Sequence, residues 1–372
     1  KLDKEILLLG LVNYLQGDNE SADMYFSQNL DPETATPEGR HLFAMNSMRL
    51  NKPKQVLELL GNDIEFSNNI ETLSLYGLAA ISTGDHTKGI AALKKALTVD
   101  PSRVRLHIAL ANTYRNQSPP DRAAALKHVQ TAYKENKDDP AIQSAMIGEL
   151  LLNGDKTEAE KIVAAVLANG AEKASSQTIA GNFYLSSGEP NIAEGFFDTA
   201  LKLEPNDINT LQSAGRTAIQ NRKWDKSAEY FSKMIQIDSS NAVGYKGLIS
   251  AYEANGDIET GLDKVKSIIT ENGNSSTAAN VIAEYYARNQ RFKEASKYSD
   301  IAQEASPEAP ETTKTITSIS YMQGRKALRE GEFDQSREAA LKGLRHDPDH
   351  PLLLILLADT EIRSKNYREA GK

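Results

Sequence analysis

The sequence predicts an all-α fold, an α-α solenoid in which short helix–turn–helix units follow one another along the chain. The stretch Ser175–Asp238 contains the same pattern twice, with a shift of 34 residues that matches Gly181 to Gly215. Apolar residues recur every three or four positions in each half of a unit, as on one face of a helix. A turn signal, often Gly-Asp, separates the halves. Repeats of this length indicate stacked helical pairs that bury their apolar faces against their neighbours.

The first three units set the pattern. Units are expected over residues 3–32 and, more weakly, 37–68, where Pro53 should begin a helix because its missing amide hydrogen is not needed there. The third unit turns at Gly84-Asp85. Glycine tolerates the positive φ of such a turn, and aspartate caps the helix that follows.

The fourth unit has a longer turn, Ser118-Pro119-Pro120-Asp121, and a stretched exit towards Pro140. We expect one solenoid over residues 1–372, with a joint near residues 116–122 that would separate 1–117 from 118–372. A turn that simply bulges outward is the alternative, since solenoids tolerate long turns.

The remaining units repeat the same order of features. Their turns are expected at residues 154–155, 187–188, near 222, 256–257, near 291 and 331–332. About ten units are therefore predicted, and an eleventh begins near Leu354. Since solenoids usually end in polar caps and this last half-unit is apolar, we expect the sequence to be a fragment of a longer protein.

Small residues are expected where two helices approach closely. A larger side chain there would overpack the contact at a cost of roughly 1–3 kcal/mol. These structural repeat positions are Gly77, Gly181, Ala200, Gly215 and Gly324.

This pattern resembles the tetratricopeptide repeat family over essentially the whole chain. One departure is the tryptophan that is common early in the first helix: it is absent, and Trp224 instead opens a second helix. The resemblance implies a right-handed superhelix whose first helices line a concave groove. Such a groove would hold an extended peptide or a helix of a partner protein.

Units three to seven are also similar to the repeat arrays of the large lipoprotein that accompanies the PEP-CTERM protein-sorting and exopolysaccharide system of Gram-negative bacteria. The similarity consists of Leu-Leu-Gly-Leu openings and Ala-Leu-x-x-Asp-Pro closings. It implies a periplasmic or outer-membrane-associated location rather than a cytoplasmic one. The alternative is any bacterial scaffold built from the same repeats.

Composition excludes several classes of protein. The net charge of −8 argues against a general nucleic-acid binder, and the absence of cysteine excludes disulfides and zinc-finger ligation. The longest apolar run, residues 352–358, is far shorter than the roughly 20 residues that span a bilayer, so no membrane span is expected.

No catalytic constellation is found, so we predict no catalytic residue, metal site or cofactor, and no enzyme. Phosphate-binding loops, Gly-x-Ser-x-Gly and His-Glu-x-x-His are absent. His346 and His350 flank acidic residues in a metal-like arrangement, but Pro348 between them indicates a turn between repeats. The six histidines are scattered: His41, His86, His107, His128, His346 and His350.

The alignment of the repeats places polar residues on one side of successive first helices, three or four residues apart. Five are arginine or lysine, which suggests a ligand with carboxylates or other negative groups. The alternative is that these charges only solubilise an exposed face. The family's lysine–asparagine clamp for a C-terminal carboxylate is not reproduced, because Ser250 stands where asparagine would be needed. The predicted partner-binding positions are Asn182, Gln212, Arg216, Lys246, Ser250, Asn280, Glu284, Arg288, Tyr321, Arg325 and Arg329.

These observations predict a non-catalytic interaction scaffold that binds a protein segment, or an acidic or anionic polymer, along its inner face. Envelope polysaccharide or protein export is the expected setting. One alternative is the regulatory or docking arm of an enzyme whose catalytic domain lies outside this sequence. Another is self-association through the apolar helix near Leu352–Leu357.

Overall fold

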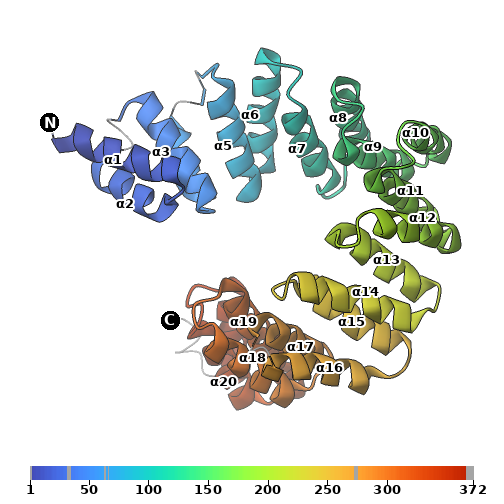
Figure 1. Cartoon of the computed structure of the whole chain (residues 1–372). Helices are drawn as coiled ribbons and strands as arrows, with labels where there is room; N and C mark the ends of the chain where they lie inside the picture. The colour runs from blue at the N-terminus through green and yellow to red at the C-terminus, as the bar shows by residue number, and fades with distance from the viewer. Residues whose placement is uncertain (1, 32–34, 63, 66, 272–274, 366–372) are drawn as a thin grey trace. The chain divides into compact units, whose positions relative to one another are not determined.

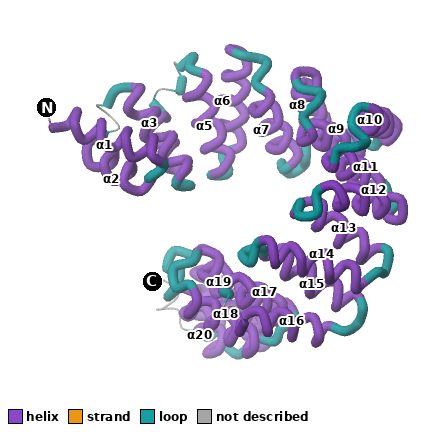
Figure 2. Tube along the Cα trace, in the orientation of Figure 1, coloured by secondary structure: helices purple, strands orange, loops and turns teal. Residues whose placement is uncertain are grey.

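The computed structural model describes residues 2–31, 35–62, 64–65, 67–271 and 275–365. Over these residues it contains 21 α-helices and no strand (Figure 2), which confirms the all-α prediction. The helices form ten consecutive pairs followed by a single last helix (Figure 1), in agreement with about ten repeats and a partial one. None of the described helices combines the length and the apolar character needed to cross a membrane.

The chain divides into two compact units, Lys1–Asn169 and Gly170–Lys372. The joint expected near residues 116–122 lies inside the first unit and stays a prediction. The helices of the first unit are α1 (Leu2–Gln16), α2 (Asn19–Asn29), α3 (Pro37–Arg49), α4 (Pro53–Leu60), α5 (Ile70–Ser82), α6 (His86–Val99), α7 (Val104–Arg115), α8 (Arg122–Glu135), α9 (Pro140–Leu152) and α10 (Lys156–Ala168).

The second unit contains the other helices. They are α11 (Ala174–Ser186), α12 (Pro190–Leu203), α13 (Ile208–Gln220), α14 (Trp224–Ile237), α15 (Ala242–Ala254), α16 (Ile258–Glu271), α17 (Ser276–Arg288), α18 (Phe292–Ala305), α19 (Pro310–Glu330), α20 (Phe333–Leu344) and α21 (Pro351–Arg363). Pro53 begins α4 and Trp224 begins α14, as predicted.

The odd-numbered helices, which are the first helices of the pairs, form one layer in each unit. Each packs on its own second helix, and most also contact the first helix of the next pair, as α3 contacts α5 and α13 contacts α15. Within the described parts of each unit, second helices of successive pairs make no contact of similar extent. Because helices are closer together on the inside of a curved array, the first helices line the inner side of each unit.

The turns inside the pairs have the geometry that the sequence predicts. At the α5–α6 turn Gly84 has a φ of +89°, and the Asp85 carboxylate accepts a hydrogen bond from the Lys88 amide at 3.1 Å. The carboxylate thereby satisfies one of the free amides at the start of α6. The α13–α14 turn has the same left-handed backbone but places Arg222 there, with a φ of +58°.

Glycine on a first helix leaves room for a side chain of the second helix. A β-carbon on Gly181 would lie 2.6 Å from Phe197 Cε1, and one on Gly215 would lie 2.8 Å from Phe231 Cε2. Both phenylalanines are almost completely buried. The aromatic ring on the second helix therefore fits only because the facing residue on the first helix has no side chain.

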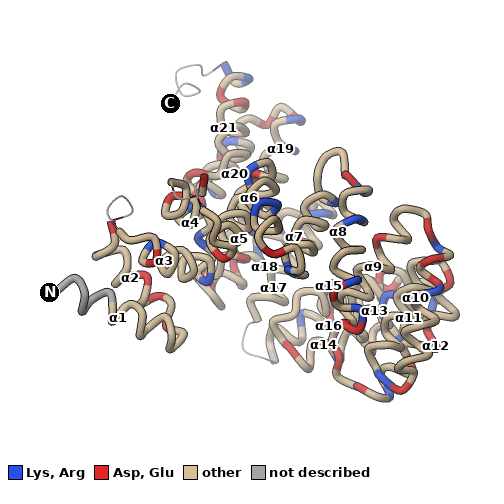
Figure 3. Tube along the Cα trace, turned by 90° about the horizontal axis from the view of Figure 1, so that it is seen from above, with Lys and Arg blue, Asp and Glu red and all other residues tan. Residues whose placement is uncertain are grey.

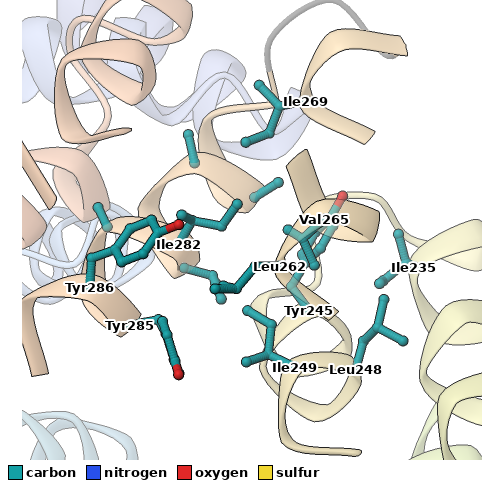
Figure 4. Packing of buried hydrophobic residues seen from close by; sticks show 14 of the residues in the cluster. Ile235, Tyr245, Leu248, Ile249, Leu262, Val265, Ile269, Ile282, Tyr285 and Tyr286 are labelled. Carbon is teal, nitrogen blue, oxygen red and sulfur yellow. The ribbon is translucent and has the colours of Figure 1, made fainter. Parts of the chain in front are cut away.

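The core of the second unit lies between its two helix layers. Tyr245 of α15 is fully buried there in a cluster with Ile235 of α14, Leu262 of α16 and Ile282 of α17 (Figure 4). The Tyr245 hydroxyl donates a hydrogen bond to the Ser239 carbonyl oxygen at 3.0 Å. This cluster includes residues of three successive pairs, so neighbouring pairs share one continuous core, as expected for a solenoid.

The last described helix, α21, keeps an exposed apolar face. Leu352, Leu354 and Ile355 are 48%, 45% and 63% exposed, whereas Leu353 and Leu356 are buried against α19 and α20. Self-association through this face stays a prediction. The segment His346–His350 forms the turn between α20 and α21, as its proline indicated. In the described part of the chain no three histidine or acidic side chains gather into a metal site.

Candidate binding face of the second unit

The predicted partner-binding residues all lie on first helices of the second unit. Asn182 is on α11, and the others are distributed over α13, α15, α17 and α19, each of which contacts the next first helix in the series. The set therefore lies in the layer of first helices of this unit, and a shared partner-binding face stays a prediction. Figure 3 shows that basic and acidic residues are interspersed along the chain, so no single charged block dominates.

Four of these residues meet in one cleft, which we call the α13/α15 cleft. It has a volume of about 360 Å³ and is lined by Gln212 and Arg216 of α13 and by Lys246 and Ser250 of α15. Its apolar lining comes from Ile219, Phe231 and Val243. Polar side chains thus surround a small apolar surface, an arrangement typical of sites that bind and orient a ligand.

A second cleft adjoins the first. This α15/α17 cleft has a volume of about 240 Å³, and its lining includes Asn280 and Glu284 of α17 and Thr315 of α19. Lys246 lines both clefts and so connects them. Its Nζ lies 2.7 Å from Glu284 Oε2, and both side chains are about half-exposed. Because exposed pairs of this kind contribute little to stability, a ligand can replace either partner at low cost.

Asn280 differs from the other predicted residues because it is buried, with an exposed fraction of 7%. Its Nδ2 donates a hydrogen bond to Thr312 Oγ1 at 3.0 Å, which connects α17 to α19. Its Oδ1 is buried and accepts no hydrogen bond from the described residues. Asn280 therefore connects neighbouring first helices, and its Oδ1 is not exposed to a ligand in the cleft.

The arginines of this face are available for a ligand. Arg216 is exposed and has no hydrogen-bond or ion-pair partner among the residues that the structure describes. Arg288 and Arg325 are exposed too, and their guanidinium carbons lie 6.0 Å and 5.9 Å from the ring centres of Tyr285 and Tyr321. Arg329 Nε donates a hydrogen bond to the Arg325 carbonyl oxygen. None of the four has a carboxylate partner within the described ranges.

Basic residues of the second helices behave differently. Lys223 and Lys226 of the α13–α14 region both contact Glu194 of α12, at 2.7 and 2.8 Å. Burial raises the pKa of Glu194, but hydrogen bonds from these lysines and from Asn221 outweigh it and lower that pKa to about 2. These charges connect one repeat to the next. Ion pairs thus join the second helices α12 and α14, whereas Arg216, Arg288, Arg325 and Arg329 of the first helices have no carboxylate partner among the described residues.

The remaining predicted residues lie outside the two clefts. Asn182 and Tyr321 are half-buried on α11 and α19. The apolar floor of the α13/α15 cleft was not predicted. Its residues come from both helices of a pair and from the next first helix, so one helical face read from the sequence could not reveal it.

Comparison with protein-family models identifies the family of the repeats. Tetratricopeptide repeat models match residues 70–103, which include α5 and α6, and residues 321–372. The chain contains tetratricopeptide repeats. Neither match is to an enzyme family. No curated protein matches the sequence. The family matches give no support for the resemblance to the exopolysaccharide-system lipoprotein, which stays a prediction.

Solved structures share the architecture of stacked tetratricopeptide repeats. The human IFIT1 dimer with m7Gppp-AAAA is 18% identical, with a TM-score of 0.42 over 98% of this chain and 87% of that one. Yeast Tom70 is 15% identical, with a TM-score of 0.39 over 100% and 90% of the two chains. Pseudomonas aeruginosa PilF is 18% identical, with a TM-score of 0.38 over 56% and 94%. At such values we draw no functional argument from them.

Proposed function

We propose that this protein is a non-catalytic scaffold whose second unit binds an acidic segment of a partner protein along α13–α19. The observation that carries the proposal is the set of exposed arginines without carboxylate partners, Arg216, Arg288 and Arg325, on the inner helix layer. Arginine binds carboxylates through paired hydrogen bonds, so these side chains favour a ligand with several acidic groups.

The two clefts support the same conclusion. The apolar floor of the α13/α15 cleft offers a place for one side chain of the bound segment. Gln212 and Ser250 at the wall of the same cleft offer side-chain hydrogen-bond partners beside that floor. An apolar contact next to the arginines suits an extended polypeptide better than a purely anionic polymer.

The proposal is tested by capture of partners from envelope and cytosolic extracts with the whole chain and with the triple variant Arg216→Glu, Arg288→Glu, Arg325→Glu. A partner that binds the parent and is lost from the folded triple variant supports the proposal. The matched control is Lys202→Glu, Lys293→Glu, Lys297→Glu, which changes the net charge equally on second helices. Equal loss with both variants, or loss with neither, would show that the arginines only solubilise the face.

The setting in envelope polysaccharide or protein export is the part of the proposal that depends on sequence resemblance alone. The same capture experiment tests it, because the partner must then appear in the envelope fraction. A cytosolic partner would instead favour the alternative of a docking arm for an enzyme.

A further inference from the structure

The first unit has an apolar cleft on its own inner helix layer. This cleft extends across the N-terminal parts of α3, α5 and α7 and has a volume of about 500 Å³. That volume lies within the roughly 300–1,000 Å³ of typical ligand sites. Its apolar lining consists of Met45, Ile70, Leu75, Leu78, Val104 and Leu106.

The chemistry of this cleft differs from that of the second unit at the same position of the repeat. Leu78 directly follows Gly77, just as Arg216 directly follows Gly215. Both glycines allow the second helix to approach, since a β-carbon on either would lie within 2.8 Å of a buried side chain. The next residue therefore faces the inner side in both units, and it is leucine in one and arginine in the other.

Polar groups at the wall of the cleft already have partners within the protein. His41 Nδ1 and Thr72 Oγ1 share a hydrogen bond of 3.1 Å, and the Ser74 hydroxyl donates to the Ile70 carbonyl oxygen. Because these groups are satisfied, they do not require polar partners from a ligand.

The charges at the rim leave one cation free. Glu71 pairs with Arg103 at 3.3 Å, and Arg103 also contacts Asp100 at 2.8 Å. Arg105 is exposed and has no hydrogen bond or ion pair with any other described residue. The cleft thus combines an apolar floor with one unpaired positive charge at its edge.

We propose that this cleft is a second binding site, separate from that of the second unit, for a partner peptide that presents leucine-like side chains beside a carboxylate. The leucine-like side chains of the peptide pack against Leu75 and Leu78, and its carboxylate pairs with Arg105. The protein is therefore a scaffold with two sites of different specificity, one for an apolar–acidic motif and one for an acidic segment.

The methionine methyl groups provide a direct test on the whole chain, since Met45 lines the cleft and Met146 and Met234 lie elsewhere. We would label the methionine methyls with carbon-13 and titrate a short synthetic peptide with the core Leu-Asp-Ser-Leu-Glu in a Gly-Ser background. The Met45 signal should shift and the Met234 signal should not. A peptide with serine in place of both leucines should cause no shift, and one with lysine in place of the acids should bind about tenfold more weakly.

Variants separate this site from the rest of the molecule. Leu78→Gln and Arg105→Glu should each weaken peptide binding by about tenfold. Val99→Gln and Lys54→Glu, comparable changes on second helices, should leave peptide binding unchanged. If Leu78→Gln lowers the melting temperature, the test depends on Arg105→Glu alone, because Arg105 is exposed and its substitution should not affect folding. The arginine triple variant of the second unit should keep the Met45 shift.

Three results would overturn the proposal. The first is the absence of a Met45 shift with the leucine peptide, and the second is an equal shift with the serine peptide. The third is an equal or larger Met45 shift with octanoate, which would identify the cleft as a site for acyl chains instead of a peptide.

Discussion

One position of the repeat, the residue after the glycine of the first helix, sets the chemistry of the inner layer. It is Leu78 in the first unit, Asn182 and Arg216 in the second, and Arg325 near the end of the chain. Since the preceding glycine packs against the second helix, the backbone orients the following side chain in the same way each time. A change at this position alters what the surface binds without altering the packing beneath it.

A pair of histidines, His107 and His128, makes the stability of the first unit depend on pH. His107 Nε2 hydrogen-bonds the Pro101 carbonyl oxygen, so it carries the proton, and His107 Nδ1 accepts from His128 Nδ1 at 2.9 Å. Burial, together with the proximity of His107, Lys94 and Lys127, lowers the pKa of His128 from 6.5 to about 4.

This pair predicts a loss of stability on acidification. The contribution of His128 is complete above pH 6.5 and is lost as the pH falls from 6.5 towards 4, because the unfolded chain binds the proton more readily. Since the ring is half-exposed, we expect a loss on the order of 1 kcal/mol at pH 5. Urea unfolding at pH 7.5 and pH 5 should show a smaller loss in His128→Leu than in the parent. Equal losses would refute this role.

At the scale of elements, the turns within the pairs, except the longer α7–α8 turn, use one left-handed residue whether or not it is glycine. Gly188 has a φ of +78° in the α11–α12 turn, and Arg222 has a φ of +58° at the matching place in the next pair. A left-handed conformation costs a side-chain-bearing residue roughly 1–2 kcal/mol. The arginine turn is therefore maintained by the packing of α13 and α14 and not by its own preference.

Reciprocal substitutions test this difference. Arg222→Gly should raise the free energy of unfolding by about 0.5–1 kcal/mol, because relief of strain exceeds the added entropy of the unfolded chain. Gly188→Ala should lower it by about 1 kcal/mol, although a β-carbon there would meet no atom within 4 Å. Chemical denaturation measures both, and a shift of the same sign in the two variants would contradict the account.

At the scale of the molecule, stability should be local. Within the described ranges, each repeat makes its extensive contacts with its immediate neighbours, and the chain divides into two compact units. In such an array, damage to one repeat propagates to its neighbours and fades with distance.

Phe26→Ala tests this locality. Phe26 is fully buried in the core of the first unit, so its truncation should cost about 3–5 kcal/mol of local stability. Hydrogen exchange should accelerate in α1–α4 and remain near the parental rate in α17–α20. The control, Phe231→Ala in α14, should accelerate exchange in α13–α16 and leave α1–α4 near the parental rate. Uniform acceleration over both units would indicate one cooperative block instead.

The sequence by itself determined the local features of this protein: helical pairs, their approximate number, the turn glycines and caps, and the helix face that carries the arginines. These depend on residues within one repeat, whose periodicity is visible along the chain. Only the tertiary structure decided which of those side chains are available. Asn280 is buried by Thr312, 32 residues away, Lys246 pairs with Glu284, and Leu78 joins residues of α3 and α7 in a cleft. Burial and pairing depend on side chains from neighbouring repeats, and no single helical pattern contains that information.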